Sequence, residues 1–199
     1  EMLGLGYLGV EHGTPLRPME KALRSKWRSL FHRCYPEKPY EISRFNTYKD
    51  CSIDKEWYNF NTFYKWAIKT YKKGLVIDKD FKSTGNKLYS STTCIFITPR
   101  LNSAIIRRRE EDRGVPLGSY YIEHLGVYNV KCSIDNKDVH IGRFKCPVEA
   151  FQAYKITKEN HIRKMATEDY ELGLISEYSY KAVLNFKIEN NKIGDIHVI

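Results

Sequence analysis

The chain has 199 residues, 42% hydrophobic and 29% charged, which is the composition of a folded protein and excludes a disordered one. This length accommodates one large domain or two small ones. The sequence has neither a run of about 18 apolar residues nor a signal-peptide pattern, so we expect no membrane segment and a cytoplasmic location. A formal net charge of +9 favours a polyanionic partner such as nucleic acid, although such charge can also serve solubility alone.

The first predicted helix lies between Pro18 and Cys34. Its apolar residues recur at helical spacing, Pro18 suits a first turn, and Pro36 ends the pattern. Residues 37–53 are irregular in pattern. The apolar residues from Trp57 to Tyr71 then predict a second amphipathic helix that ends before Gly74, and its aromatic residues are expected to fill a core.

A strand, a loop, a second strand and a helix are predicted next. Residues 75–78 and 94–97 are short apolar runs typical of strands, and the polar stretch between them contains Gly85 and Asn86. Thr98 before Pro99 is a helix-start signal, because a threonine hydroxyl can cap free amides and proline is preorganised for a first turn. We expect that helix to continue to about residue 106.

The second half begins after a charged connector, residues 107–113. Residues 119–123, 128–134 and 139–144 have β character and turn residues between them, which predicts three antiparallel strands. Pro147 opens an amphipathic helix that can lie against one face of this sheet. The expected fold class is α+β. The expected divisions are residues 1–106, the connector 107–113, a domain at 114–170, and a C-terminal helix with an extended tail at 171–199.

Five cysteines are widely spaced and never form a C-x-x-C pair, so disulfides are not expected. A zinc site formed by Cys34, Cys51 and either His12 or His32 is an alternative. The paired spacing of structural zinc sites is missing, however, which disfavours it.

The strand–loop–strand–helix segment places Asp78 at the end of its first strand and Asn102 one turn into its helix. A carboxylate and an amide oxygen can together hold a hard cation such as Mg²⁺ or Mn²⁺ while water and phosphate take the remaining positions. Such an ion can polarise a phosphodiester. Spacing alone favours a simpler interpretation, in which Asp78 and Asp80 belong to a solvated turn beside a strand and Asn102 is a polar residue on a helix surface.

This segment resembles the ββα-metal core of phage HNH homing endonucleases. The resemblance is carried by residues 76–80, 85–90 and 93–102, and by the upstream Trp27-Arg28-Ser29-Leu30, Arg33-Cys34-Tyr35 and Trp57-Tyr58-Asn59-Phe60. It implies that Asp78 and Asn102 are metal ligands of a phage-encoded DNA endonuclease acting in the host cytoplasm. It also places Lys79 where the family carries its general-base histidine, which makes Lys79 the third candidate catalytic residue.

Lysine is a poor substitute for histidine as a general base, since it accepts a proton near pH 7 only if its pKa is lowered strongly. The alternative function is therefore a catalytically inactive DNA-binding protein that acts in regulation or interferes with host machinery. A module that binds only protein is a third possibility, and it explains neither the charge nor the second resemblance described next.

Residues 113–164 are similar to the plant ethylene-response-factor (Apetala) type DNA-binding domain. The similarity includes Gly142-Arg143-Phe144 and Glu149-Ala150-Phe151-Gln152-Ala153-Tyr154. It implies a three-stranded sheet that enters the major groove of double-stranded DNA with a helix behind it. Ser133 and His140 stand where that family commonly has arginine and tryptophan, so sequence preference does not carry over. The candidate DNA contacts, including the connector arginines, are Arg107, Arg108, Arg109, Arg113, Tyr121, Lys131, Ser133, Lys137, His140 and Arg143.

Overall fold

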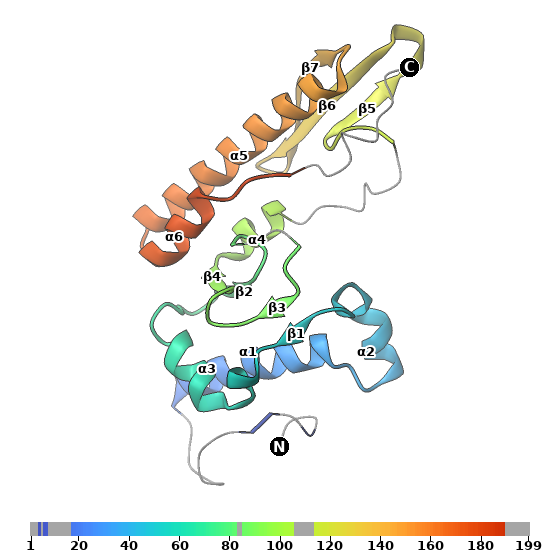
Figure 1. Cartoon of the computed structure of the whole chain (residues 1–199). Helices are drawn as coiled ribbons and strands as arrows, with labels where there is room; N and C mark the ends of the chain where they lie inside the picture. Colours follow the sequence, from blue (N-terminus) through green and yellow to red (C-terminus); the bar gives the residue numbers. More distant parts are fainter. Residues whose placement is uncertain (1–3, 5, 8–16, 83–84, 106–113, 190–199) are drawn as a thin grey trace.

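The structure is a computed structural model, and it describes residues 4, 6–7, 17–82, 85–105 and 114–189 (Figure 1). Its fold is α+β, as the sequence predicts. The helices of the described residues are α1 (Pro18–Cys34), α2 (Pro39–Arg44), α3 (Phe60–Ala67), α4 (Pro99–Ile105), α5 (Pro147–Glu171) and α6 (Glu177–Leu184). The strands are β1 (Ser52–Ile53), β2 (Val76–Asp78), β3 (Leu88–Tyr89), β4 (Ile95–Ile97), β5 (Ser119–Ile122), β6 (Val127–Ile134) and β7 (Lys137–Phe144).

Helix α1 has the predicted bounds, and its apolar side forms the centre of an aromatic core. The Trp27 ring lies 4.9 Å from that of Phe31 and 5.6 Å from that of Phe60, measured between ring centroids. The Trp27 indole N–H donates to the backbone oxygen of Trp57 at 2.6 Å, which satisfies the polar atom of a buried ring. This core fixes α1 against the segment that leads into α3.

The second helix is shorter than its apolar pattern predicts. Residues 55–58 form a 3-10 turn, and α3 begins only at Phe60. The reason is Asn59, whose backbone is extended and whose side-chain oxygen accepts the N–H of Asn61 at 2.9 Å. This N-cap interrupts the helix that the aromatic periodicity would otherwise continue. Residues 37–53, irregular in sequence, contain α2 and the short strand β1.

The two predicted strands after α3 pair with each other. Strands β2 and β4 are antiparallel, with Asp78 opposite Ile95, and α4 follows β4 directly. The loop between them contains β3, which pairs in parallel with β1 and was not predicted. Thr98 acts as the expected cap, because its hydroxyl oxygen accepts the N–H of Leu101 at 3.4 Å.

The predicted three-stranded sheet is confirmed. Its strand order is β5-β6-β7, and both pairings are antiparallel. Asp135 and Asn136 connect β6 to β7 with φ values of 49° and 62°, the left-handed conformations that a tight hairpin turn requires. A register shift occurs opposite Val130 and Lys131, so Ile141 is an extra residue on β7.

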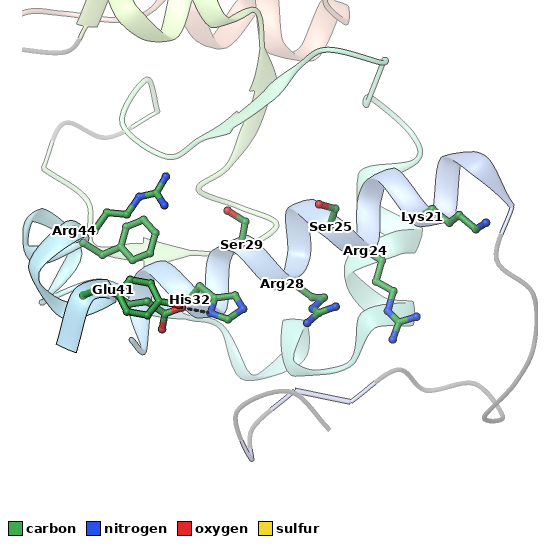
Figure 2. Close-up of a pocket in the computed structure, with 10 residues that line it drawn as sticks. Lys21, Arg24, Ser25, Arg28, Ser29, His32, Glu41 and Arg44 are labelled. Carbon is green, nitrogen blue, oxygen red and sulfur yellow. Dashed lines mark hydrogen bonds and ion pairs between the residues drawn. The ribbon is translucent and has the colours of Figure 1, made fainter. Parts of the chain in front are cut away.

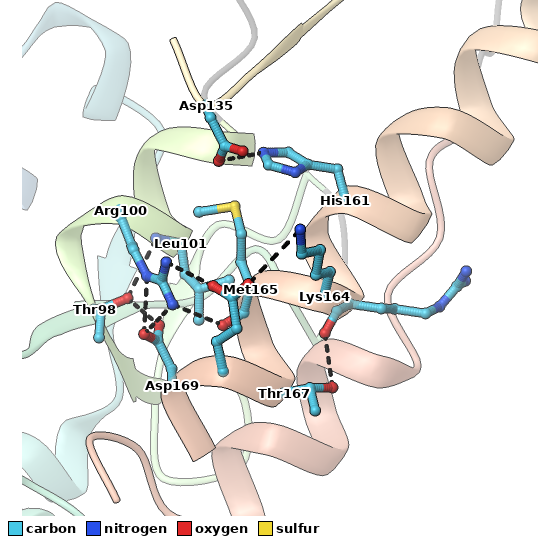
Figure 3. A network of polar contacts seen from close by, with 11 residues as sticks. Thr98, Arg100, Leu101, Asp135, His161, Lys164, Met165, Thr167 and Asp169 are labelled. Carbon is cyan, nitrogen blue, oxygen red and sulfur yellow. Dashed lines mark hydrogen bonds and ion pairs between the residues drawn. The ribbon is translucent and has the colours of Figure 1, made fainter. Parts of the chain in front are cut away.

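Helix α5 connects the sheet to the first half of the chain (Figure 1). Its first turns pack on β6, and its last turns contact α4 and α6. Asp169, in the final turns, is fully buried and accepts from the Thr98 hydroxyl at 2.5 Å and from the Arg100 Nε at 2.9 Å (Figure 3). The two halves are therefore joined by a buried polar network as well as by apolar contacts.

Apolar packing extends across the two halves of the chain. The connector 107–113 lies outside the described residues, but one hydrophobic cluster contains residues from both sides of it. Ile162 and Met165 of α5 and Val183 of α6 belong to the same cluster as Trp27 and Phe96. None of the helices in the described residues is long and apolar enough to cross a membrane.

Candidate functional site

Asp78 and Asn102 line one pocket, which has a volume of about 690 Å³. Asp78 is the last residue of β2, and Asn102 is the fourth residue of α4. The antiparallel pairing of β2 with β4 places the end of β4, and with it the start of α4, beside Val76 at the start of β2. Helix α4 contacts β2, and one turn into that helix Asn102 lines the same pocket as Asp78, 24 positions earlier in the chain. Lys79 lines the same pocket.

The Asp78 carboxylate is buried and held in a fixed orientation. Its Oδ1 accepts the backbone N–H groups of Asp80 and Phe81, both at 2.9 Å. Burial raises the pKa of Asp78 to about 6, the Phe81 N–H lowers it, and the charge of Asp80 raises it. Because both backbone bonds use Oδ1, the carboxylate has a second oxygen, Oδ2, with which it could bind a cation.

Lys79 is buried beside Asp78 but forms an ion pair with the other neighbour. Its Nζ lies 2.7 Å from Oδ1 of Asp80 and 5.8 Å from the centroid of the Tyr89 ring. In this pair Lys79 acts as a hydrogen-bond donor to the Asp80 carboxylate. The arrangement suits Lys79 to binding an anion more than to acting as a general base.

Two cations from α1 complete the pocket, and the sequence analysis did not select either as a site residue. Lys26 and Arg33 both line it, together with Ser25 and Ser29 of the same helix. Arg33 is held by Ser29, whose backbone oxygen accepts from the Arg33 Nε at 3.1 Å and whose hydroxyl oxygen accepts from Nη2 at 3.2 Å. Burial, followed by the charge of Arg33, lowers the pKa of Lys26. Lys26 and Arg33 are seven residues apart, so they lie on one side of α1, next to its apolar stripe, and this spacing was available in the sequence.

The donor set fits a divalent cation accompanied by a phosphate better than a cation alone. Asp78 and Asn102 supply oxygen ligands of the kind that Mg²⁺ prefers. Lys26, Arg33 and Lys79 would repel an isolated cation but would attract a phosphate bound to it. Among the described residues, no group of three or more His, Cys, Asp and Glu side chains could hold a metal ion. A metal at Asp78 would therefore take its remaining ligands from water and phosphate.

The alternative zinc site gains no support from the described residues. Cys34 and Cys51 are buried free thiols, and burial raises the pKa of both, that of Cys34 to about 12. Zinc binds the thiolate, so a raised pKa opposes binding. His32 lies 3.2 Å from Glu41, and His12 is outside the described residues.

Four of the candidate DNA contacts share one face of the three-stranded sheet. Val130 and Cys132 of β6 are buried, whereas Lys131 and Ser133 are exposed on the opposite face. Cross-strand pairing places His140 beside Lys131, and Arg143 beside Asn129 on the same face. Asn129 is buried at its centre, where its Oδ1 lies 2.9 Å from His140 Nε2 and 3.4 Å from Arg143 Nε. Asn129 was not selected from the sequence.

The register places the remaining candidates elsewhere. Tyr121 pairs with Tyr128, and Lys137 with Ile134, which puts both on the face of Val130 and Cys132. The tyrosine on the exposed face is Tyr120, whose ring lies 5.8 Å from Lys131 Nζ. The connector arginines lie outside the described residues: Arg107, Arg108, Arg109 and Arg113.

Comparison with protein-family models, with curated proteins and with solved structures finds no match to this chain. The function is therefore argued from the residues and their geometry.

Proposed function

We propose that this chain is a DNA-binding, metal-dependent endonuclease whose active site is the pocket of Asp78 and Asn102. One observation carries the proposal: the carboxylate of Asp78 and the amide of Asn102 line a single pocket together with three basic side chains, which come from α1 and from the residue after β2. Oxygen ligands suit a divalent metal ion, and the cations suit the phosphodiester on which that ion would act. The likeness to the ββα-metal core of HNH endonucleases, seen in the sequence, supports the same assignment.

The proposed roles follow from position. Asp78, oriented by two backbone N–H groups, and Asn102 would hold Mg²⁺ or Mn²⁺, which when bound polarises the scissile phosphodiester and stabilises the leaving oxygen. Lys26 and Arg33 would bind the non-bridging phosphate oxygens. Lys79, which is ion-paired with Asp80, would donate a hydrogen bond to the bound phosphate. The sheet face of Lys131, Ser133, His140 and Arg143 would contact double-stranded DNA.

The defining experiment is incubation of the full chain with duplex DNA in Mg²⁺, Mn²⁺ or EDTA, followed by gel analysis. We expect cleavage in either metal and none in EDTA. Asp78→Ala and Asn102→Ala should each abolish cleavage while the affinity for DNA changes by no more than a few-fold, because these residues act on the chemistry. Undiminished cleavage by both purified variants would contradict this site.

A specific observation favours the second candidate function, a DNA-binding protein without nuclease activity. Lys79 stands at the base position and is ion-paired with Asp80, and no imidazole lines the pocket in the described residues. If DNA binds and remains intact in both metals, this second function is the correct one.

Replacing Lys79 with histidine is expected to increase cleavage. The imidazole would sit beside the Asp80 carboxylate, which can orient it, and it accepts a proton near neutral pH. We expect Lys79→His to raise the single-turnover rate at least several-fold, with the largest gain near pH 7. Lys79→Gln is the control, since it can hydrogen-bond to Asp80 but has neither charge nor a basic nitrogen. A folded, DNA-binding histidine variant no faster than the parent would argue against this position for the base.

The sheet makes a separate prediction about affinity. Lys131 is exposed and central on the proposed DNA-binding face. Lys131→Ala should cost roughly 1–3 kcal/mol of binding free energy if the side chain reads a base, or lower the salt slope by about one unit if it meets phosphate alone. Lys137→Ala is the matched control, because its register places it on the other face. Fluorescence anisotropy across a salt series measures the affinity and its salt slope for each variant. Equal effects of the two variants would contradict this assignment of faces.

A further inference from the structure

A second pocket lies beside α1 and is not part of the site described above. It has a volume of about 780 Å³ and is walled by α1 and α2 (Figure 2). Its lining contains the basic side chains Lys21, Arg24, Arg28 and Arg44. Lys21, Arg24 and Arg28 follow one another at helical spacing, so they form a continuous basic stripe along α1.

The positive charge of this pocket is not neutralised from within the described part of the chain. There, no carboxylate lies within ion-pair distance of Lys21, Arg24, Arg28 or Arg44. Glu41, the acidic residue of the lining, faces His32 at 3.2 Å instead. The Arg24 Nε is buried and has no hydrogen-bond partner among the described residues. A buried guanidinium N–H without a partner is costly, and an anionic ligand would supply one.

The two pockets are adjacent across α1. Ser25 and Ser29 line both of them, and in Figure 2 these serines extend from one side of the helix while Arg24 and Arg28 extend from another. The cations Lys26 and Arg33 face the first pocket, and the basic stripe faces the second. A polyanion could therefore contact cations and hydroxyl groups continuously as it crosses the helix.

We propose that the basic pocket between α1 and α2 binds the phosphate backbone of the nucleic acid whose scissile phosphate enters the Asp78 pocket. This inference rests on the proposed function. The phosphates flanking the scissile one would lie against Arg24, Arg28 and Arg44, and Ser25 and Ser29 would bridge the two pockets. The pocket would position the strand without reading its sequence, since arginine–phosphate contacts are independent of the base.

The test is duplex DNA binding by the full-length double variant Arg28→Gln/Arg44→Gln. Both arginines are exposed and come from opposite walls of the pocket, so folding should be preserved, and circular dichroism checks this. The control is Lys164→Gln/Lys181→Gln, which removes the same charge from exposed positions on α5 and α6. We expect the arginine variant to bind about tenfold more weakly at 0.1 M salt. Its slope of log affinity against log salt should fall by about two units, since each phosphate contact contributes about 0.9. The control should change neither quantity substantially.

The outcomes separate this proposal from the nuclease proposal. Weaker binding and a lower slope, in a protein whose parent cleaves duplex DNA, support both. The same binding loss in a protein that never cleaves DNA supports the basic pocket and contradicts the nuclease. An arginine variant that binds like the parent, or a control that loses as much affinity, overturns the basic pocket while leaving cleavage by the parent intact. A parent protein that binds no duplex overturns both. Should the arginine variant fail to fold, Lys21→Gln/Arg28→Gln is measured by the same criteria.

Discussion

Asp78→Asn is expected to stabilise the metal-free protein and to abolish its metal-dependent cleavage. Asparagine keeps a side-chain oxygen that can accept the Asp80 and Phe81 N–H groups, but it removes a buried negative charge. Burial raises the pKa of Asp78 from 3.8 to about 6. At 1.36 kcal/mol per pKa unit, the charged carboxylate therefore destabilises the folded state by roughly 3 kcal/mol relative to a solvated one. Cleavage should fall at least a hundredfold, because a neutral amide is a much weaker ligand for Mg²⁺.

The stability gain has a defined dependence on pH. The folded-state pKa of Asp78 is higher than its unfolded value of 3.8, so between about pH 4 and 6 the folded state binds more protons. As the pH rises through this window, the unfolding free energy of the parent therefore decreases relative to that of the variant. The difference between the two unfolding free energies should be near zero below pH 4 and should reach its full value above pH 6. Urea denaturation of both proteins at pH 4, 5, 6 and 7.5 measures it.

Metal titration provides an independent check of the same variant. At pH 7.5, Mg²⁺ or Mn²⁺ should raise the melting temperature of the parent, by binding the folded state, and should not raise that of Asp78→Asn. Asp50→Asn is the control, because its carboxylate is 62% exposed, also lies near a lysine and does not line the Asp78 pocket. If parent and Asp78→Asn have equal unfolding free energies from pH 4 to 7.5 and equal responses to metal, then the buried charge of Asp78 does not destabilise the fold and Asp78 is not a metal ligand.

Asp169→Ala is expected to destabilise the protein by about 3 kcal/mol. Asp169 is fully buried and joins α5 to the start of α4 through Thr98 and Arg100, and Arg100 Nη2 lies 2.7 Å from its Oδ1 (Figure 3). Removing one partner of a buried ion pair costs about 3–5 kcal/mol. The lower figure applies here, because the Arg100 side chain is 43% exposed and can be solvated in part.

The adjacent residue is the control for this prediction. Glu168 also pairs with Arg100, at 3.0 Å, but its side chain is 42% exposed. Glu168→Ala should cost less than about 1 kcal/mol. Urea denaturation compares the two, and similar losses would mean that burial of Asp169 does not set its contribution. A large loss only for Asp169→Ala would also show that a fragment of residues 114–170, which lacks Thr98 and Arg100, cannot be as stable as the intact chain.

Local features of the fold were determined by the sequence itself. The bounds of α1 followed from its apolar periodicity and from the prolines at its start and after its end. The threonine–proline pair predicted the start of α4, and runs of β-forming residues separated by turn residues predicted the three-stranded sheet. These signals succeed because each reports backbone preferences and burial over a few consecutive residues. The same reasoning also identified Asp78 and Asn102 as a pair, since one short strand–loop–strand–helix unit carries both.

The remaining features depend on contacts between distant segments. Only the tertiary structure places Lys26 and Arg33 of α1 in the pocket of Asp78, and only the strand register separates Tyr121 from the face of Lys131. Only the tertiary structure shows that one hydrophobic cluster contains residues from both sides of the predicted connector 107–113. Periodicity shows which side of an element is buried, but it does not say which partner covers that side. The partner is chosen by shape and charge complementarity between surfaces, and these exist only once the chain has folded.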